Sequence, residues 1–574
     1  MAPSTESDAA TQDAVRARPW FSGWRAGALI VALAAVMFLL RLGAEPLTSP
    51  NEGLYAEAAR EMVEGHDLIV PHINSVVYFE KPPLLYWLAA AAMVVFGENA
   101  MAARLPSALA GIASVYFVLL MGGFLLGPRP ARSLPAIVLA TSLGFVIMAR
   151  QVMFDALLCA TITASLVLFW MASERKSRAA VYGMYAALAL GVMTKGLMGL
   201  LLPAMVIVVY CAVARDWARL KPIASLGGIA LFLALAVPWH VAAALRNHDF
   251  LWFYFVNEHV MRYLAKRWPY DFPRQRAWVP ALGVIYLAMP WSVLLPAFGY
   301  YVRSLPRRGL RLRPELIFVL CWALVPLLFF TLSKSRTAYY MLPVIPPFAL
   351  LVGSLWAAIA EGAGDPSLRR WVTGSLLVTF LIVFAAWVWA STLMGGGDRG
   401  SDRAELAFVS CSFLVVGLAA AVVIAFRGRL GTALSCLAVG SALALTTASV
   451  VVNRWPAGDS LQQMAQLTNR LAAGGEVTVV VDNRLEMNSS FVFYLDQQLR
   501  PVRVVEGRRG GDLEFGSLDP AVRGLFLSNG DLRRLASTRR VVLLTDDPPR
   551  YQRPPGFHTI MRYRTDILWA NFGP

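Results

Sequence analysis

Charged residues and cysteines are both scarce in this chain. Charged side chains make up 15% of its 574 residues, whereas soluble domains normally carry about 25%. This shortage excludes a soluble fold for most of the chain. The five cysteines all lie inside apolar blocks and form no Cys-x-x-Cys pair. The sequence therefore indicates neither a disulfide framework nor a zinc ribbon.

The charge that is present is unbalanced toward the basic side. Lysine and arginine number 52 against 36 acidic residues, which leaves a net charge of +16. Many of these basic residues lie in short loops between apolar blocks. That distribution is typical of the positive-inside bias of membrane proteins and of contact with anionic lipid, and it argues against a nucleic-acid partner.

Apolar residues fall into long blocks. They make up 57% of the sequence, and the mean hydropathy is +0.56. Blocks of roughly 16–23 residues are long enough to cross a bilayer as helices. The sequence predicts a polytopic α-helical membrane protein with about 13 transmembrane helices, at 26–41, 105–126, 134–149, 156–173, 179–194, 197–214, 223–245, 278–300, 314–332, 340–360, 372–393, 405–426 and 431–452.

The two ends of the chain are predicted to lie on opposite sides of the membrane. Residues 1–22 are polar and no small-residue cleavage site follows the first apolar block, so we expect a cytoplasmic N-terminal segment and a retained span. The block at 84–96 has only 13 residues and is predicted to lie along the interface. With this assignment every inside loop carries at least two basic residues, and the chain after 453 lies outside.

The segment 457–574 mixes polar and apolar residues, unlike the predicted transmembrane domain at 23–453. Strand-like runs alternate in it with helix-like segments, the strands at 477–481, 502–505 and 541–545 and the helices at 459–473 and 489–498. Such alternation predicts a small C-terminal α/β domain on the outer surface.

The first predicted outer segment has the pattern of an amphipathic helix. An apolar stripe at helical spacing runs from Leu54 to Met62 with the acidic residues on other faces, so we expect a helix near 52–64 on the membrane surface. Asn51 and Glu52 at its start fit a helix cap with a favourable dipole interaction and fit a site role equally well.

The next outer segment places Glu80 and Lys81 directly before two prolines and an aromatic helix start. One interpretation is an interfacial ion pair within a belt of tyrosine and tryptophan. In the functional interpretation, Lys81 binds a lipid-linked phosphate. Glu80 would then bind a metal ion, act as a general base or orient a neighbouring side chain.

Four more charged residues lie at the predicted ends of spans: Arg104, Arg150, Asp155 and Lys195. Charges so close to lipid are unfavourable and by default suggest function. Snorkelling to the interface is the alternative for Arg104 and Arg150. Lys195 lies in a tight turn before a glycine, where snorkelling is a poorer explanation.

Two further predicted outer loops carry basic residues, although the positive-inside bias places most lysines and arginines in cytoplasmic loops. The long loop 246–277 contains His259, Arg274 and Arg276, and the turn 333–340 contains Arg336, Tyr339 and Tyr340. Lysines and arginines beside carboxylates at the membrane surface are what a phosphate-bearing lipid donor requires. The tyrosines could line a donor cavity, although an aromatic belt explains them too.

Several short motifs together resemble those of one family. They are Tyr55-Ala56-Glu57, the stretch Phe-Glu-Lys-Pro-Pro-Leu from Phe79 to Leu84, Arg-Leu-Pro-Ser from Arg104 to Ser107, the aspartate Asp155, the Thr-Lys-Gly turn at Lys195, and Glu258-His259. On these residues the chain resembles the bacterial lipid A aminoarabinose transferases. Those enzymes belong with the protein O-mannosyltransferases among the GT-C type integral-membrane glycosyltransferases that use polyprenyl-phosphate donors.

The resemblance implies a fold and a reaction. The fold has interfacial helices in the first outer loop, thirteen spans and a periplasmic C-terminal domain in the bacterial inner membrane. The reaction transfers 4-amino-4-deoxy-L-arabinose from undecaprenyl phosphate to a lipid A phosphate, which weakens the binding of polymyxin. The chain departs from the family at Asn51 and Leu54, where the family usually has aspartate and arginine.

The resulting hypothesis is direct displacement at the anomeric carbon of the sugar. Its catalytic residues are Glu52, Asp155 and Glu80, and Glu80 with His259 could share a divalent metal. No other cofactor is predicted. The predicted substrate-binding residues are Asn51, Tyr55, Tyr78, Lys81, Arg104, Arg150, Lys195, Arg274, Arg276, Arg336, Tyr339 and Tyr340.

Three other functions stay open at this stage. A transporter would need midplane helix breaks and usually inverted repeats, and the sequence has no internal repeat. A non-catalytic lipid-binding protein would tolerate substitution of Lys81 or Asp155. A related transferase would use the same kind of donor but glycosylate protein or another envelope glycolipid.

Overall fold

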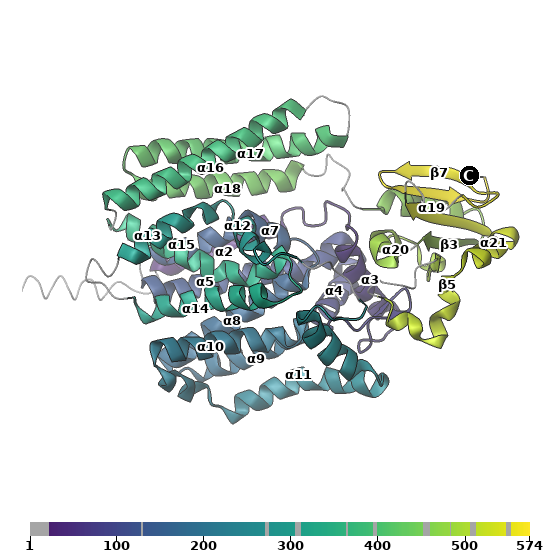
Figure 1. Cartoon of the computed structure of the whole chain (residues 1–574), viewed down its shortest axis with the longest axis horizontal. Coiled ribbons are helices and arrows are strands. Elements are labelled where there is room, and N and C mark those ends of the chain that lie inside the picture. The colour runs from purple at the N-terminus through teal and green to yellow at the C-terminus, as the bar shows by residue number, and fades with distance from the viewer. Residues whose placement is uncertain are drawn as a thin grey trace, which may run out of the picture.

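The computed structural model is a helical protein with a small sheet at one end (Figure 1). It describes residues 22–127, 130–269, 275–304, 312–362, 365–393, 399–451, 460–482, 484–505, 513–546 and 553–573. The helices of the larger part are α2 Ser22–Leu39, α3 Asn51–Glu64, α4 Leu84–Phe96, α5 Ala100–Leu126, α6 Leu134–Ala140, α7 Leu143–Ala149, α8 Phe154–Arg175, α9 Arg178–Lys195, α10 Met198–Ala214, α11 Leu226–Arg246, α12 Val279–Leu287, α13 Leu295–Ser304, α14 Pro314–Leu332, α15 Ile345–Ala360, α16 Pro366–Leu393, α17 Arg399–Phe426 and α18 Leu430–Val451.

Every predicted span coincides with one or two of these helices. Within the described residues, eight helices are long and apolar enough to cross a membrane, or up to ten if each of two bent pairs counts as one span. Three shorter apolar helices, at 25–39, 84–96 and 198–214, add to these. The protein is therefore a multi-pass membrane protein, and the count of thirteen stays a prediction.

Two predicted spans are not continuous helices. The span 134–149 is divided into α6 and α7, which meet at 67°, and the span 278–300 is divided where α12 and α13 meet at 110°. At the first break, the hydroxyl of Ser142 donates to the carbonyl of Val138 at 2.8 Å, and the N–H of Leu143 donates to Met289 instead of continuing the helix. At the second break, Pro290 lacks the N–H that would continue the helix.

The helices form three groups (Figure 1). α16, α17 and α18 pack together along one side, and α9, α10 and α11 lie on the opposite side. Between them α5 packs against α8, and α15 packs against α5 and α6. The sheet lies at one end of the bundle, beside α3 and α4.

α3 confirms the predicted helix near 52–64, but the expected environment of its acidic residues is wrong. Glu52, Glu57 and Arg60 are all buried rather than facing away from the protein. Glu52 is covered by Arg104 and the segment at Val152, whereas the C-terminal part of the chain covers Glu57 and Arg60. Arg60 donates to the backbone carbonyls of Phe493 and Val492.

The C-terminal part is a six-stranded sheet with helices, as its sequence predicts. The strand order is β5-β4-β3-β6-β8-β7, with β3, β4, β5 and β6 parallel and the β7–β8 hairpin antiparallel. Its elements are α19 Gln462–Ala472, β3 Val477–Asp482, α20 Ser489–Phe493, β4 Arg503–Val505, β5 Phe526–Leu527, α21 Asn529–Thr538, β6 Arg540–Asp546, β7 His558–Tyr563 and β8 Asp566–Ala570. The strands β3, β4 and β6 confirm the three predicted runs.

Polar contacts between residues far apart in the sequence hold the sheet against the segment between α2 and α4. Arg500 forms a two-pronged ion pair with Glu64, both contacts at 2.9 Å. The side chain of Asn74 donates to the carbonyl of Val502 at 2.8 Å and accepts from its N–H at 2.7 Å. A Cβ at Gly53 would overlap the backbone of Ser490, so the close approach of α3 to α20 requires glycine.

Glu61 makes this interface sensitive to pH. Burial, with the nearby charge of Glu57, raises the pKa of Glu61 to about 8. A carboxyl group whose folded pKa exceeds its unfolded value binds more protons in the folded state, so stability falls as pH rises through this window and levels off above it. We expect Glu61→Gln to remove a slope of at most about 1.4 kcal/mol per pH unit.

Thermal unfolding of the detergent-solubilised protein at several pH values between 5 and 9 measures that slope. The slope is the readout, because the amide of glutamine also changes the hydrogen bonds to Asn74 and Ser75 at every pH. The exposed Glu98 provides the control, since Glu98→Gln should leave the slope as it is in the parent. An unchanged slope in Glu61→Gln would contradict the prediction.

Candidate active site

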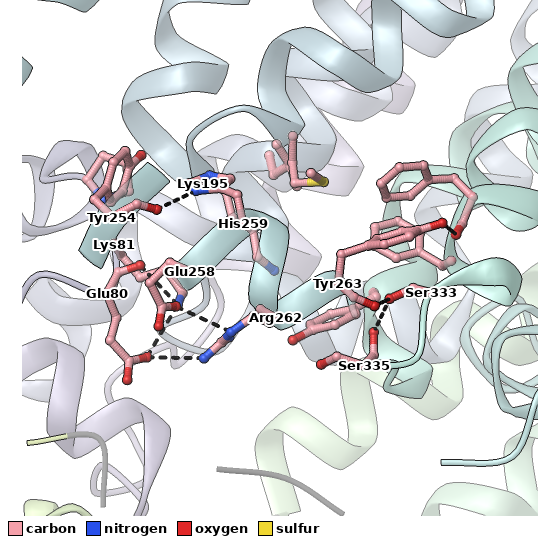
Figure 2. A pocket seen from close by; sticks show the side chains of 16 residues that line it. Glu80, Lys81, Lys195, Tyr254, Glu258, His259, Arg262, Tyr263, Ser333 and Ser335 are labelled. Carbon is pink, nitrogen blue, oxygen red and sulfur yellow. Dashed lines mark hydrogen bonds and ion pairs between the residues drawn. The ribbon is translucent and has the colours of Figure 1, made fainter. Parts of the chain in front are cut away.

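A cavity of about 660 Å³, part of it open to solvent, lies among four segments of the helical part. They are the residues before α4, the end of α9, the π-helical segment η3 Trp252–Met261 with the residues after it, and the turn around Ser333 to Ser335. The polar side chains at its wall are those of Glu80, Lys81, Lys195, Glu258, His259, Arg262, Ser333 and Ser335 (Figure 2).

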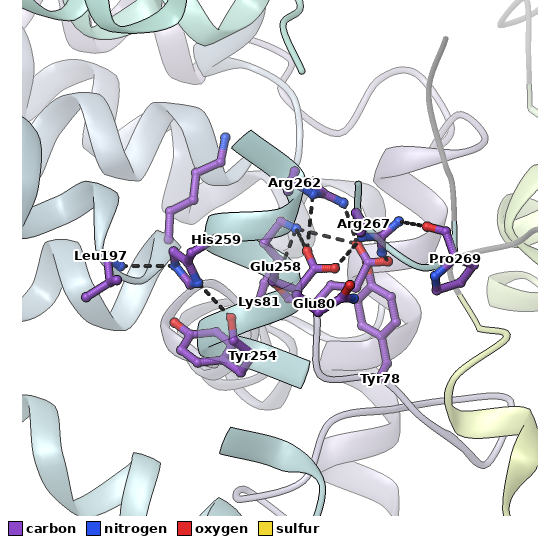
Figure 3. A network of polar contacts seen from close by, with 12 residues as sticks. Tyr78, Glu80, Lys81, Leu197, Tyr254, Glu258, His259, Arg262, Arg267 and Pro269 are labelled. Atoms are coloured by element: carbon purple, nitrogen blue, oxygen red, sulfur yellow. Dashed lines mark hydrogen bonds and ion pairs between the residues drawn. The ribbon is translucent and has the colours of Figure 1, made fainter. Parts of the chain in front are cut away.

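A buried network of two carboxylates and three cations forms one wall (Figure 3). Lys81 lies 3.5 Å from the Glu80 carboxylate and 3.9 Å from Glu258. Arg262 lies 3.5 Å from Glu80 and 3.3 Å from Glu258. Arg267 forms short ion pairs with both carboxylates and donates to the Pro269 carbonyl at 2.9 Å.

The ion-pair distances of Arg267 and Lys81 indicate different roles for these two cations. Arg267 is 4% exposed and is closely paired with Glu80 and Glu258, so it neutralises them. The contacts of Lys81 are longer than the 2.7–2.9 Å of strong charge-assisted hydrogen bonds. The ammonium group of Lys81 is therefore the better placed to bind an anion entering the cavity.

Lys195 and Asp155 form a second ion pair at the cavity. Asp155 lies in the first turn of α8 and Lys195 is the last residue of α9, and their charged atoms are 2.7 Å apart. The Lys195 ammonium also lies 4.5 Å from the ring centre of Tyr340, a favourable cation–π arrangement. Asp155, Lys195 and Tyr340, three of the candidate site residues named from the sequence, thus lie together in the structure.

His259 uses both ring nitrogens within the protein. Its Nε2 accepts from the N–H of Leu197 at 3.1 Å, so the proton lies on Nδ1, which donates to the carbonyl of Tyr254 at 2.7 Å (Figure 3). Burial lowers the pKa of His259, which favours this neutral form. His259 therefore fixes the turn after α9 to η3.

These arrangements do not fit the suggested metal site. Glu80 is paired with arginines, and His259 has no free nitrogen. No group of three or more His, Cys, Asp or Glu side chains in the described part of the chain is placed to hold a metal ion. Metal binding at Glu80 and His259 would need both residues to rearrange, and it stays an untested prediction.

The turn at Gly196 provides a test of this arrangement. Gly196 has φ +62°, and a Cβ there would overlap the His259 ring and the Tyr254 hydroxyl. We expect Gly196→Ala to displace η3 and to lower kcat/KM by about tenfold or more, because small displacements of positioning groups have large effects on rate. The measurement is a transfer assay on purified enzyme, with Gly299→Ala, which meets no neighbouring atom, as the control.

A second group of predicted residues lies apart from this network. Glu52 binds Arg104 through two contacts of 2.7 Å and accepts from the N–H of Val152 at 3.1 Å. Burial alone would raise the pKa of Glu52, but the Arg104 guanidinium and the hydrogen bonds from the N–H groups of Val152 and Thr48 together lower it. Arg150 donates to the carbonyls of Met37, Phe38 and Leu40 and so caps α2.

The remaining predicted residues occupy varied positions. Asn51 is the first residue of α3, and no side-chain hydrogen bond caps that helix. Tyr55 packs edge-to-face on Phe154, with ring centres 4.9 Å apart. The Tyr78 hydroxyl lies 3.3 Å from the Glu80 carboxylate. Tyr339 packs against Tyr340, with ring centres 5.1 Å apart.

The predicted arginines also differ in position. Arg336 is half-buried, and its Nε and Nη1 have no hydrogen-bond partner among the described residues. Arg276 is exposed, and Arg274 lies outside the described residues. In the long loop, Arg262 and Arg267 instead join the network, although neither is among the residues predicted above.

Two comparisons establish the fold. The structure matches the crystal structure of ArnT from Cupriavidus metallidurans bound to undecaprenyl phosphate with a TM-score of 0.78, at 23% identity, over 96% of this chain and 100% of that one. The model of the dolichyl-phosphate-mannose-protein mannosyltransferase family matches residues 80–241. These matches give the chain the GT-C fold, the fold of integral-membrane glycosyltransferases.

Relatives identify the family within that class. An undecaprenyl phosphate-α-4-amino-4-deoxy-L-arabinose arabinosyl transferase of Yersinia enterocolitica is 30% identical over 410 residues, which are 68% of this chain and 71% of the relative. A transferase of the same name from Erwinia tasmaniensis is 29% identical over a match that covers 89% of this chain and 92% of the relative. The chain belongs to the family of these arabinosyl transferases.

Proposed function

We propose that the chain transfers 4-amino-4-deoxy-L-arabinose from undecaprenyl phosphate to a phosphate of lipid A. The names of its relatives support both the sugar and the carrier. The observation that carries the proposal is the cavity in which Lys81 lies beside Glu80 and Glu258 with room for an anionic group.

Lys81 and Arg262 would hold the carrier phosphate. The carboxylates of Glu80 and Glu258 are opposed by Lys81, Arg262 and Arg267, which leaves one positive charge in excess. A phosphate can join this network as an additional acceptor, because an ammonium has three donors and a guanidinium has five. The unpartnered nitrogens of Arg336 are further candidate donors near Ser335.

The reaction is a displacement at the anomeric carbon. The bond between that carbon and the carrier phosphate oxygen breaks, and its electron pair leaves with undecaprenyl phosphate. A bond to an oxygen of the acceptor phosphate forms at the same carbon. An acceptor phosphate is already anionic near pH 7, so the step needs no general base, and the main requirement is to neutralise the departing phosphate.

Asp155 and Lys195 would organise the sugar-binding side of the cavity. Their 2.7 Å ion pair joins the first turn of α8 to the last of α9. In this proposal Lys195 contacts the phosphate or the sugar, and Asp155 sets the position of Lys195. Glu52 acts at a distance, since it is bound to Arg104 and holds the segment that leads to Asp155.

The proposed location is the periplasmic face of the inner membrane. The sheet and the candidate site belong to segments that the basic-loop pattern assigns to the outside. The proposed division is a cytoplasmic segment 1–22, a membrane domain 23–453 and a periplasmic α/β domain 457–574. The position of the sheet beside α3 and α4 supports this arrangement (Figure 1).

Mass spectrometry of lipid A tests the proposal in cells. We expect the added mass of an aminopentose in cells with the protein and its loss in cells without it. Unchanged lipid A would overturn this acceptor. The match to the mannosyltransferase family model favours, as the second candidate, a polyprenyl-phosphate-sugar transferase that acts on protein or another envelope glycolipid.

A further inference from the structure

Two grooves lie on the two sides of α16, near its start. The first, of about 1480 Å³ and partly open, lies between α16 and the bent segment α12–η4–α13, in which η4 is Trp291–Leu294. The second, of about 1040 Å³ and partly open, lies between α16 and the end of α17. α13 lies at the end of the helical part away from the sheet (Figure 1). Neither groove shares a lining residue with the candidate active site.

The bend at Pro290 explains the first groove. α12 and α13 meet there at 110°, and α16 packs on α13 and on η4. A continuous helix over 279–304 could follow the straight α16, but a helix that turns so sharply cannot. The turn leaves a space beside α16 that Ile285 of α12 and Leu295 of α13 help to line.

The walls of the grooves are largely apolar and face outward. Ile285, Leu295, Trp371 and Val378 line the first groove and are 39–55% exposed. Phe426 lines the second and is 61% exposed. All five belong to helices that have the length and composition of membrane spans, alone or as a bent pair. These side chains therefore provide a surface for acyl chains of the bilayer.

Gly374 joins the two grooves. It lines both of them, as Arg370 does, and a Cβ at Gly374 would meet no atom within 4 Å. Arg370, Gly374 and Val378 follow one another at intervals of four residues, so they lie on one face of α16 over about 12 Å of helix. A large side chain at position 374 would separate the grooves, whereas glycine lets one molecule with two chains occupy both.

Arg370 provides a cation at the start of the grooves. It is exposed and makes no ion pair or hydrogen bond with the residues that the structure describes. The adjacent Arg369 instead donates to the carbonyl of Phe426 at 2.7 Å. Asp365, which lines the second groove, accepts from the Tyr300 hydroxyl at 3.2 Å and caps α16. Arg370 can therefore bind a phosphate group.

Each groove also contains a buried hydroxyl group that needs a partner. The Ser292 hydroxyl belongs to the first groove and the Thr373 hydroxyl to the second. The two residues are 4% and 8% exposed, and neither hydroxyl has a hydrogen-bond partner in the described part of the chain. A buried hydroxyl without a partner is unfavourable. The ester carbonyls of a diacyl lipid are acceptors that would satisfy both.

We propose that the two grooves bind one anionic diacyl phospholipid, with its phosphate on Arg370 and one acyl chain on each side of Gly374. The basic-loop pattern assigns this end of the bundle to the cytoplasmic leaflet, where anionic lipids attract basic residues. The two grooves and two hydroxyls fit two ester-linked chains better than the single chain of a polyprenyl phosphate. The bound lipid would connect α13 with α16 and α17.

Two variants test the headgroup and the acyl chains separately. Arg370→Gln removes the cation, and Arg427→Gln is its control, because Arg427 is exposed nearby and lines neither groove. Gly374→Phe blocks the passage between the grooves without overlapping another part of the protein. Gly123→Phe is the matched control, since Gly123 of α5 also has open space at its Cβ and lines neither groove.

Binding is measured on the full-length protein in detergent by native mass spectrometry. The probes are phosphatidylglycerol and phosphatidylcholine with the same acyl chains, and undecaprenyl phosphate. We expect the parent to bind phosphatidylglycerol about fivefold more tightly than phosphatidylcholine, the effect of about 1 kcal/mol from one basic residue, and Arg370→Gln to lose this preference. Gly374→Phe should bind both phospholipids about tenfold more weakly. Both controls should stay within about twofold of the parent.

The outcomes are distinct. Equal binding of the two phospholipids to the parent, or an unchanged preference in Arg370→Gln, would overturn the role of Arg370 and with it an anionic ligand. Unchanged binding in Gly374→Phe, or an equal loss in Gly123→Phe, would mean ordinary contact with bulk lipid and would overturn the site. A matching loss of undecaprenyl phosphate in Gly374→Phe would assign the grooves to the carrier lipid instead. Sugar transfer is not part of this readout, so the result is independent of the proposed function.

Discussion

Replacing Lys81 with alanine should lower kcat/KM for sugar transfer by about a hundredfold to a thousandfold, the effect of removing one preorganised donor from a developing charge. Lys81 is 8% exposed, lines the cavity and has ion-pair contacts of 3.5 and 3.9 Å, so it can bind the departing phosphate. A transfer assay with purified enzyme and polyprenyl-phosphate-linked sugar measures the effect.

The control for this prediction is an exposed lysine from the long loop. Lys266→Ala removes the same charge near the site without touching the cavity, and activity should stay within about twofold. Lys81→Arg should recover only part of the rate, since a guanidinium has a different shape from an ammonium. Full activity in Lys81→Ala with normal lipid binding would remove Lys81 from the mechanism.

Replacing Arg267 with alanine should destabilise the protein by about 3–5 kcal/mol, because it leaves two buried carboxylates without their main partner. Glu80 and Glu258 are 5% and 7% exposed, and both are paired with Arg267. Thermal unfolding in detergent measures the change. Arg276→Ala, which removes an exposed arginine of the same loop, should change stability by less than about 0.5 kcal/mol.

A second substitution separates charge from packing. In the double variant Arg267→Ala with Glu258→Gln, one of the two stranded charges is gone, so part of the lost stability should return. The coupling between the sites should be about 0.5–3 kcal/mol, as for groups in direct contact. Strictly additive effects would mean that Arg267 acts through its packing and not through the ion pairs.

Most of the membrane helices could be predicted because they are long and apolar and most are separated from the next by charged loops. The bends could not be predicted equally well, since serine at 142 and proline at 290 occur within apolar runs that read as continuous. The β7–β8 hairpin was missed because its turn at Arg564 has φ +57° without the glycine or asparagine that normally indicates such a turn.

The site was partly predictable for a similar reason. Lys81, Asp155 and Lys195 stand out as charges at the ends of apolar blocks, and the structure brings them to one region. The long loop offers many arginines of equal character, and only tertiary packing selects Arg262 and Arg267. Pairs such as Glu52 with Arg104 join residues 52 positions apart, which no local pattern relates.

The position of the sheet has a consequence for biosynthesis. Arg60 of α3 depends on carbonyls of Phe493 and Val492, more than 430 residues later in the chain. Phe515 stacks on Phe253 of η3, with ring centres 4.0 Å apart, and η3 carries Glu258 and His259. The loop between α2 and α4 is therefore made early but receives its cover last, so the walls of the cavity are complete only when the C-terminal sheet has folded against them.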